Sequence, residues 1–239
     1  MSTGGSRERA EIHHEHRDVS GGWLRPSVFG AMDGLVSNFA LIAGVAGGTD
    51  DTKVIALAGV AGLAAGAFSM AGGEYVSVAS QRELALAEID VERRELQRHP
   101  EAEEEELAGV YVAQGVEPAL AAEVARQISR NPNKALEVHA QAELGVTPAD
   151  LPSPKTAAVS SFLAFGVGAL LPLLPYLLGV TDLVASAIVS CLALFGAGAL
   201  VSRVTARSWW YSGLRQLVVG AAAAALTFGL GNLLGETAL

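Results

Sequence analysis

Five stretches of predominantly apolar residues alternate with polar segments along the chain. A helix needs about 20 such residues to cross the hydrocarbon core of a membrane, and each stretch is long enough. The pattern therefore predicts an all-α integral membrane protein with five transmembrane helices. These are Ser27–Gly48, Val54–Ser80, Thr156–Leu178, Leu183–Val204 and Gly213–Leu234.

The segment between the second and third apolar stretches is polar, and prolines and glycines divide it. Proline stops a helix, and glycine often follows the last helical turn. The breakers predict four helices, at Gln81–Arg98, Glu101–Gln114, 118–130 and Lys134–Leu144. The domain organisation that follows is a polar tail (1–26), transmembrane helices 1 and 2 (27–80), a helical insert (81–150) and transmembrane helices 3 to 5 (151–239).

Composition agrees with a membrane protein. Apolar residues make up 51% of the chain and charged residues only 17%, whereas soluble domains contain about a quarter charged residues. A single cysteine, Cys191, excludes an internal disulfide framework. The net charge of −9 argues against nucleic acid as a partner, because phosphate binding needs a basic surface.

The distribution of Lys and Arg predicts the orientation. Of 16 such residues, only Lys53 lies on the side opposite to the N-terminus and the insert. Cytoplasmic loops are the ones that carry excess positive charge. We therefore expect the N-terminus and the insert in the cytoplasm and the C-terminus outside. An odd number of spans also suits a homodimer in which two chains complete one pathway.

Two carboxylates lie inside predicted spans. A charged group at membrane depth is costly and usually faces a cavity or a partner, so Asp33 and Glu74 are candidates for a transport path. Met70 precedes Glu74 by one helical turn, and Asn38 follows Asp33 at similar depth. Carboxylate, thioether and amide groups together suit a first-row divalent metal. The alternative is that Glu74 extends to the membrane interface and Met70 merely packs.

Glutamates concentrate in the first helices of the insert, which holds 15 acidic and eight basic residues between positions 81 and 155. Like charges on one helix face repel unless a cation neutralises them, and facing glutamates bind metal in helical bundles. The alternative is a solvated acidic face. The candidate metal ligands are Glu88, Glu92, Glu95, Glu103, Glu106, His139 and Glu143. A histidine cluster in the tail (His13, His14, His16) is either a weak metal site or a polar tail.

Four runs of residues carry a resemblance to a known family. They are His16–Arg25, Asp33–Leu41 (DGLVSNFAL), Met70–Tyr75 (MAGGEY) and Glu143–Gly145. On these runs, nearly the whole chain resembles the vacuolar iron transporter family in its bacterial form. The resemblance implies a homodimer of five-span subunits that exports cytoplasmic Fe²⁺, and often Mn²⁺, in exchange for protons. It also implies a pathway at the dimer interface lined by the first two spans.

Site residues follow from the same resemblance. Asp33 matches the metal-site aspartate of the first span and Met70 the methionine of the second. The glutamates of the cytoplasmic metal-binding domain match Glu92, Glu95, Glu103, Glu106 and Glu143. The chain departs from the pattern where eukaryotic members carry two adjacent methionines, because His139 and Ala140 stand there. Glu74 is a second departure, in a segment that tends to be uncharged in eukaryotic members.

The function predicted is proton-coupled export of Fe²⁺ or Mn²⁺ from the cytoplasm, in metal homeostasis and detoxification, across a bacterial plasma membrane. No enzymatic activity and no prosthetic group are expected. The alternatives are a membrane-tethered, ferritin-like protein that oxidises Fe²⁺ and a metal sensor. The insert lacks the Glu-x-x-His pairs of ferritin-like sites. We also expect metal release between about pH 7 and 5.5 to be dominated by His139, since ordinary glutamates stay ionised over most of that range.

Overall fold

The computed structural model describes residues 22–205 and 207–237, and within them every regular element is helical. The tail histidines His13, His14 and His16 lie outside the described residues. The predicted all-α class is confirmed, and five helices of this part are long and apolar enough to cross a membrane, as many as the sequence predicts. They are α1 (Leu24–Gly48), the first part of α2 (Thr52–Arg98), α6 (Pro154–Leu177), α7 (Leu183–Thr205) and α8 (Trp209–Thr237).

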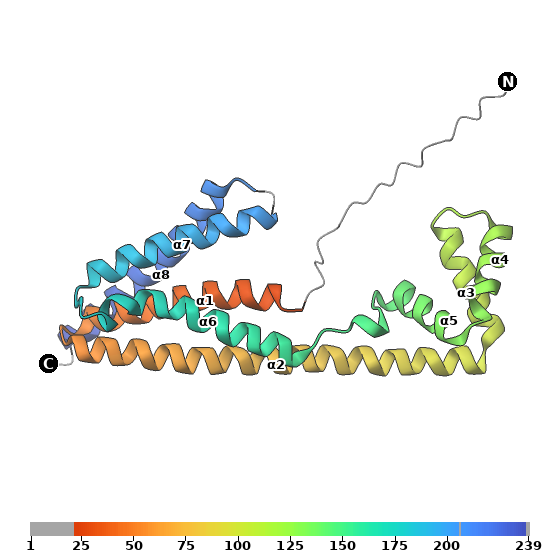
Figure 1. Ribbon diagram of the computed structural model, residues 1–239, viewed down its shortest axis with the longest axis horizontal. Helices are drawn as coiled ribbons and strands as arrows, with labels where there is room; N and C mark the ends of the chain where they lie inside the picture. Colours follow the sequence, from red (N-terminus) through yellow and green to blue (C-terminus); the bar gives the residue numbers. More distant parts are fainter. Residues whose placement is uncertain (1–21, 206, 238–239) are drawn as a thin grey trace, which may run out of the picture.

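The second span and the first insert helix form one uninterrupted helix, α2. Its 47 residues extend for about 70 Å at 1.5 Å per residue. Asp51 caps its start by accepting a hydrogen bond from the Lys53 amide at 2.9 Å. It ends at Arg98, because Pro100 disfavours helical backbone in the preceding residue, His99. The chain contains no helix breaker where the predicted span meets the predicted insert, so the backbone continues without a joint (Figure 1).

Three further helices complete the insert: α3 (Pro100–Ala113), α4 (Pro118–Ser129) and α5 (Pro132–His139). Each begins with proline, which lacks the amide hydrogen that a first turn leaves unpaired. The α5 helix passes into a single π-helical turn, Ala140–Leu144, which Gly145 ends with a positive φ of 66°. The fourth predicted insert helix, Lys134–Leu144, therefore corresponds to α5 followed by this π turn. It begins at Pro132, earlier than predicted, and its last turn is π-helical instead of α-helical. A short 3₁₀ turn, Pro148–Asp150, precedes α6.

Helix α1 lies at the centre of the membrane helices, packed along α6 on one side and α8 on the other. Glycines permit the closest approaches. A Cβ on Gly34 would lie 2.2 Å from the Phe165 carbonyl oxygen, and one on Gly231 would lie 1.8 Å from that of Gly44. Backbone-to-backbone packing of this kind is typical of membrane helices.

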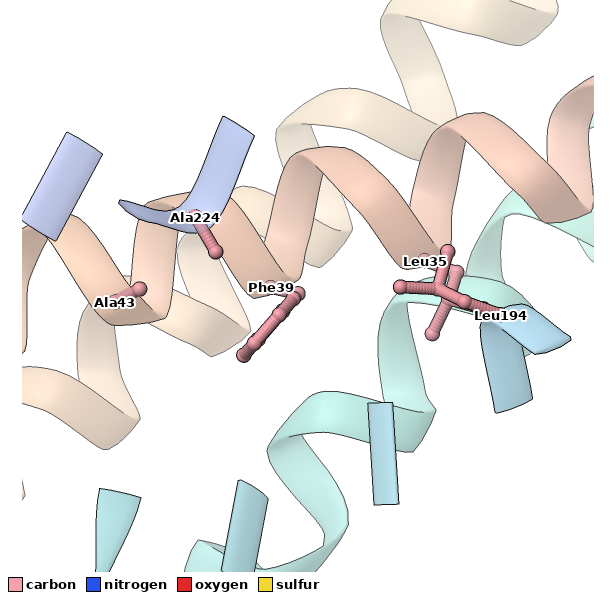
Figure 2. Close-up of a cluster of buried hydrophobic side chains, with 5 residues drawn as sticks. All are labelled: Leu35, Phe39, Ala43, Leu194 and Ala224. Atoms are coloured by element: carbon pink, nitrogen blue, oxygen red, sulfur yellow. The ribbon is translucent and has the colours of Figure 1, made fainter. Parts of the chain in front are cut away.

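Side chains also bond across the membrane helices. Asn38 Nδ2 donates to the Ala169 carbonyl at 2.6 Å, linking α1 to α6. Thr227 Oγ1 donates to the Ala40 carbonyl at 2.6 Å, linking α8 to α1. Apolar contacts complete the packing, and Figure 2 shows one cluster formed by Leu35, Phe39, Ala43, Leu194 and Ala224.

The exit from the insert is tied back to α2. Arg82 Nη1 donates to the carbonyl oxygen of Leu151 at 3.1 Å. Leu151 belongs to the connection that leads from the insert into α6. The bond therefore holds both ends of the insert together where they meet the membrane helices.

Candidate functional site

A cavity of about 240 Å³, here called the membrane cavity, lies between α1, α2 and α6. Five polar or sulfur-bearing side chains converge there within otherwise apolar helices. Its lining is Asp33, Ser37, Asn38, Leu41, Gly62, Gly66, Ser69, Met70 and Phe165. Three of the four predicted path residues, Asp33, Asn38 and Met70, therefore come together.

Asp33 and Asn38 supply oxygen atoms to this cavity. Ser37 Oγ donates to Asp33 Oδ1 at 3.0 Å, which orients the carboxylate. Asn38 is 2% exposed, and its Oδ1 has no hydrogen-bond partner among the described residues. Its Nδ2 is committed to the Ala169 carbonyl, so the amide orientation is set by that acceptor. A buried, unpaired carbonyl oxygen is costly alone and favourable beside a cation.

Two glycines of α2 make room for side chains of neighbouring helices. Gly62 lies under Leu41 and Asn38, and Gly66 lies under the ring of Phe165. These glycines make room for side chains from α1 and α6 rather than for a close backbone crossing. They thereby place Asn38 against α2, at the cavity.

Glu74 does not line the membrane cavity, although it lies one turn from Met70. Its side chain is 9% exposed, so the alternative in which it extends outward to the membrane interface is not supported. It is buried on α2 between the cavity and the insert.

A second group of polar side chains, here called the insert cluster, consists of Glu92, Glu103, His139 and Glu143. One potential ligand atom from each lies within 4.8 Å of all the others. His139 Nδ1 is 3.0 Å from Glu92 Oε1, 3.1 Å from Glu143 Oε1 and 3.5 Å from Glu103 Oε2. The residues come from α2, α3, α5 and the π turn, so the cluster joins all parts of the insert except α4.

The distances from His139 Nδ1 are those of hydrogen bonds or ion pairs, and they are also short enough for the groups to share one ion. Neighbouring ligands on an ion bonded at about 2.1 Å lie roughly 3.0 Å apart. The imidazole is 1% exposed and turns Nδ1 toward the carboxylates. Three carboxylates and one imidazole nitrogen form a mixed oxygen and nitrogen donor set that suits Fe²⁺ or Mn²⁺.

The cluster carries more negative charge than its single histidine can neutralise. Burial, together with the carboxylates of Glu143 and Glu103, raises the pKa of Glu92 from its ordinary 4.5 to about 7. Burial likewise raises the pKa of Glu103, although His139 opposes this change. A divalent cation or bound protons would relieve the repulsion.

The remaining predicted ligands lie around the cluster or away from it. Glu95 is half-buried, and its charge contributes to the raised pKa of Glu103. Glu106 is exposed and acts in the same way on both Glu92 and Glu103. Glu88 is exposed and does not belong to the cluster. Glu88 precedes Glu92 by one helical turn and so shares its face of α2, but only Glu92 belongs to the cluster.

Sequence reasoning missed two features of these sites. Ser37 follows Asp33 by one turn, so the i, i+4 spacing was the available signal for their hydrogen bond. The π-helical turn after His139 had no signal apart from the closing Gly145. Such turns occur often at functional sites, and this one carries Glu143, whose Oε1 lies 3.1 Å from His139 Nδ1.

The raised pKa of Glu92 corrects one expectation. Glutamates do not all stay ionised between pH 7 and 5.5, because Glu92 takes up a proton in that range. Protonation of Glu92 therefore also competes with metal in this range.

A pH dependence of stability follows. Because the pKa of Glu92 is higher in the folded protein than in the unfolded chain, the folded state binds more protons between pH 4.5 and 7. The free energy of unfolding of the metal-free protein should therefore fall as pH rises through this window. We expect a lower thermal midpoint at pH 7.5 than at pH 5.5 in chelator, with a smaller difference in Glu92→Gln. Glu101→Gln, an exposed glutamate on α3, is the control; an equal loss of pH dependence in both variants would contradict the assignment.

Comparison with known proteins points to one family. Residues 24–232 match the profile of the VIT family. The chain is 39% identical over 229 residues to a vacuolar iron transporter of Acanthamoeba castellanii, covering 92% of this chain and 82% of the relative. It is 32% identical over 227 residues to vacuolar iron transporter 1 of Arabidopsis thaliana, covering 92% and 90%. It is 33% identical over 224 residues to vacuolar iron transporter 2 of Oryza sativa subsp. japonica, covering 91% and 90%.

Proposed function

The chain belongs to the VIT family, the vacuolar iron transporters, and on this premise we propose that it exports Fe²⁺ or Mn²⁺ from the cytoplasm in exchange for protons. Such an activity serves metal homeostasis and protects against excess metal. The names of the relatives support iron as cargo. Mn²⁺ enters the proposal through the donor set of the insert cluster, because oxygen and imidazole ligands accept both ions.

One observation carries the proposal: a cavity with a carboxylate, an amide oxygen and a thioether lies inside the apolar part of the helices. Asp33 is the only carboxylate in its lining, and Asn38 presents an unpaired oxygen. A carboxylate inside a membrane span is energetically costly, so its presence favours a protein that binds or moves a cation there. Met70 adds a softer ligand, which favours Fe²⁺ and Mn²⁺ over Mg²⁺ and Ca²⁺.

The transport path begins at the insert cluster in this proposal. The cluster collects the ion, and the continuous α2 helix connects it to the membrane cavity. Buried Glu74 lies between the two sites on that helix. In the cavity, Asp33 holds either the metal or a proton. Protonation from the other side of the membrane would release the ion, which couples export to proton entry.

The assembly proposed is a homodimer in a bacterial plasma membrane, with the insert and N-terminus in the cytoplasm and the C-terminus outside. The excess of Lys and Arg on the insert side supports this orientation. The odd number of spans supports the dimer. The bacterial membrane rests on the motifs that match the bacterial form of the family.

A membrane-tethered protein that oxidises Fe²⁺ is the main rival, and a metal sensor is the other. The insert cluster contains only one histidine. An oxidase at this cluster would also leave the membrane cavity, which lies far from it along α2, without a role. A sensor likewise needs no carboxylate within a span. Oxygen consumption on addition of Fe²⁺ separates the oxidase from the transporter.

Transport by the reconstituted full chain tests the proposal. Proteoliposomes are loaded with a metal-sensitive dye, and Fe²⁺ (under anaerobic conditions) or Mn²⁺ is added outside, with and without an imposed pH gradient. We expect metal to enter in both cases and faster when protons flow in the opposite direction. Metal entry equal to that of empty vesicles would refute transport, and entry indifferent to the gradient would refute proton coupling alone.

A further inference from the structure

Three arginines occupy the hairpin formed by α7 and α8, and the hairpin has no acidic residue between positions 183 and 235. Two of them, Arg203 and Arg207, line a cavity of about 560 Å³ at the turn between the helices, together with Ser208 and Trp209. This is called the basic cavity here. Both arginines are exposed, and neither has an ion-pair partner among the described residues. In a chain of net charge −9, this is an uncompensated positive site.

An apolar groove of about 580 Å³ lies beside the basic cavity, between α1, α6 and α7. Leu200 lines both, so the two spaces adjoin. Each helix contributes a small residue to the groove: Ala31, Ala164 and Ala197. The hydroxyls of Ser27 and Ser160 in the lining donate to carbonyls of their own helices, at 2.7 Å each. The groove therefore offers little but apolar surface.

Exposed aromatic residues mark the depth of this region in the membrane. Trp209, Trp210 and Tyr211 are each at least half exposed at the start of α8, and Trp23 is 55% exposed at the start of α1. Trp and Tyr collect at the boundary between hydrocarbon and headgroups. Trp209 is held by an edge-on contact with Phe195, with ring centroids 5.9 Å apart. The basic cavity thus lies at headgroup level, and the groove extends toward the hydrocarbon. Figure 1 shows this end of the hairpin on the same side of the helices as the insert.

We propose that the basic cavity and the apolar groove together bind one anionic phospholipid of the leaflet on the insert side. Arg203 and Arg207 hold the phosphate, Ser208 donates to it, and an acyl chain fills the groove between α1, α6 and α7. Basic pockets between membrane helices bind anionic headgroups in this way, and guanidinium groups bind phosphate with two parallel hydrogen bonds. Charge complementarity favours a lipid over a second copy of this acidic chain. The adjoining groove favours a lipid over free phosphate.

Native mass spectrometry of the full chain in neutral detergent tests the proposal, because it counts bound lipids and subunits together. The probes are dioleoyl phosphatidylglycerol, dioleoyl phosphatidylcholine and inorganic phosphate. We expect one phosphatidylglycerol per chain, with weaker binding of phosphatidylcholine. Arg203→Gln with Arg207→Gln should weaken phosphatidylglycerol binding roughly 30-fold, at about tenfold or less for each charge lost. Arg215→Gln removes the third arginine of the hairpin, which lines neither space, and should change binding less than about twofold.

Two further variants test the parts of the site separately. Ala197→Phe fills the groove and should weaken lipid binding, whereas Ala222→Phe, on an exposed face of α8, should not. Arg203→Lys with Arg207→Lys keeps the charge and should retain most of the preference for phosphatidylglycerol, which decides the matter if the glutamine pair does not fold. Equal lipid binding by the wild type and the glutamine pair would overturn the proposal. Equal binding of phosphate and phosphatidylglycerol, with no effect of Ala197→Phe, would also overturn it. A change in the number of subunits in Ala197→Phe would overturn it too, because it would identify the groove as a protein interface.

Discussion

Asp33→Asn should reduce metal transport by roughly 30-fold or more while the protein remains folded and assembled. The substitution keeps the size of the side chain and its bond to Ser37 but removes the only carboxylate of the membrane cavity. Loss of one partner of a buried charge pair costs about 2–5 kcal/mol. Asp33 is only half-buried, so the lower end of that range applies, and about 2 kcal/mol is roughly 30-fold. Initial rates of Mn²⁺ entry into proteoliposomes measure the effect, and size-exclusion chromatography checks assembly.

Asp50→Asn is the matched control for this prediction, since Asp50 is an exposed aspartate that follows the end of α1 outside the cavity. It removes the same charge and should leave the rate within about twofold. Ser37→Ala should give an intermediate loss, because the carboxylate stays but loses one orienting bond. A wild-type rate in Asp33→Asn would remove Asp33 from the pathway.

Glu92→Gln combined with Glu103→Gln should weaken Mn²⁺ binding by the insert roughly 100-fold. Two of the four side chains of the insert cluster lose their charge. Glu92 and Glu103 are the two buried carboxylates of the cluster. The same pair should raise the thermal midpoint of the metal-free protein at pH 7.5, because repulsion between buried carboxylates disappears. A binding loss of this size corresponds to about 2.8 kcal/mol, or about 1.4 kcal/mol for each carboxylate. Free Mn²⁺ measured by electron paramagnetic resonance during a titration of the full chain gives the affinity.

Glu101→Gln combined with Glu105→Gln is the control for the insert. Both residues are exposed on α3, so the pair removes the same charge from the insert at positions outside the cluster. Binding should change less than about threefold, through long-range attraction alone. Equal losses in the two double variants would mean that the acidic surface, rather than the cluster, attracts the metal.

Helix positions were predictable because their signals are local. Apolar length identified the five spans, and Pro100, Pro118 and Gly145 stand where helices begin or end. The boundary predicted between the second span and the insert does not coincide with a helix end, because α2 continues across it without a break. A membrane boundary changes the solvent around a helix, and nothing in the backbone has to change with it.

The sites were predictable only as sets of candidates. Asp33, Asn38 and Met70 were identified because polar groups are costly inside an apolar span unless they contact a cavity or a partner. The three residues do line one cavity. Glu74 met the same criterion and lies elsewhere. Its position depends on how α2 is rotated against α1 and α6, and a single helix carries no information about that rotation.

Five apolar helices, an acidic helical insert and carboxylates inside apolar spans could be predicted from the sequence alone, because length, polarity and proline act on neighbouring residues. Tertiary structure decided which glutamates meet His139. Glu92 and Glu103 come within reach of it, whereas Glu88, on the same face of α2, does not. Ligand atoms within 4.8 Å of one another require a specific crossing of α2, α3 and α5, with Glu143 on the π-helical turn that follows α5. Such a crossing is set by packing between segments distant in the chain.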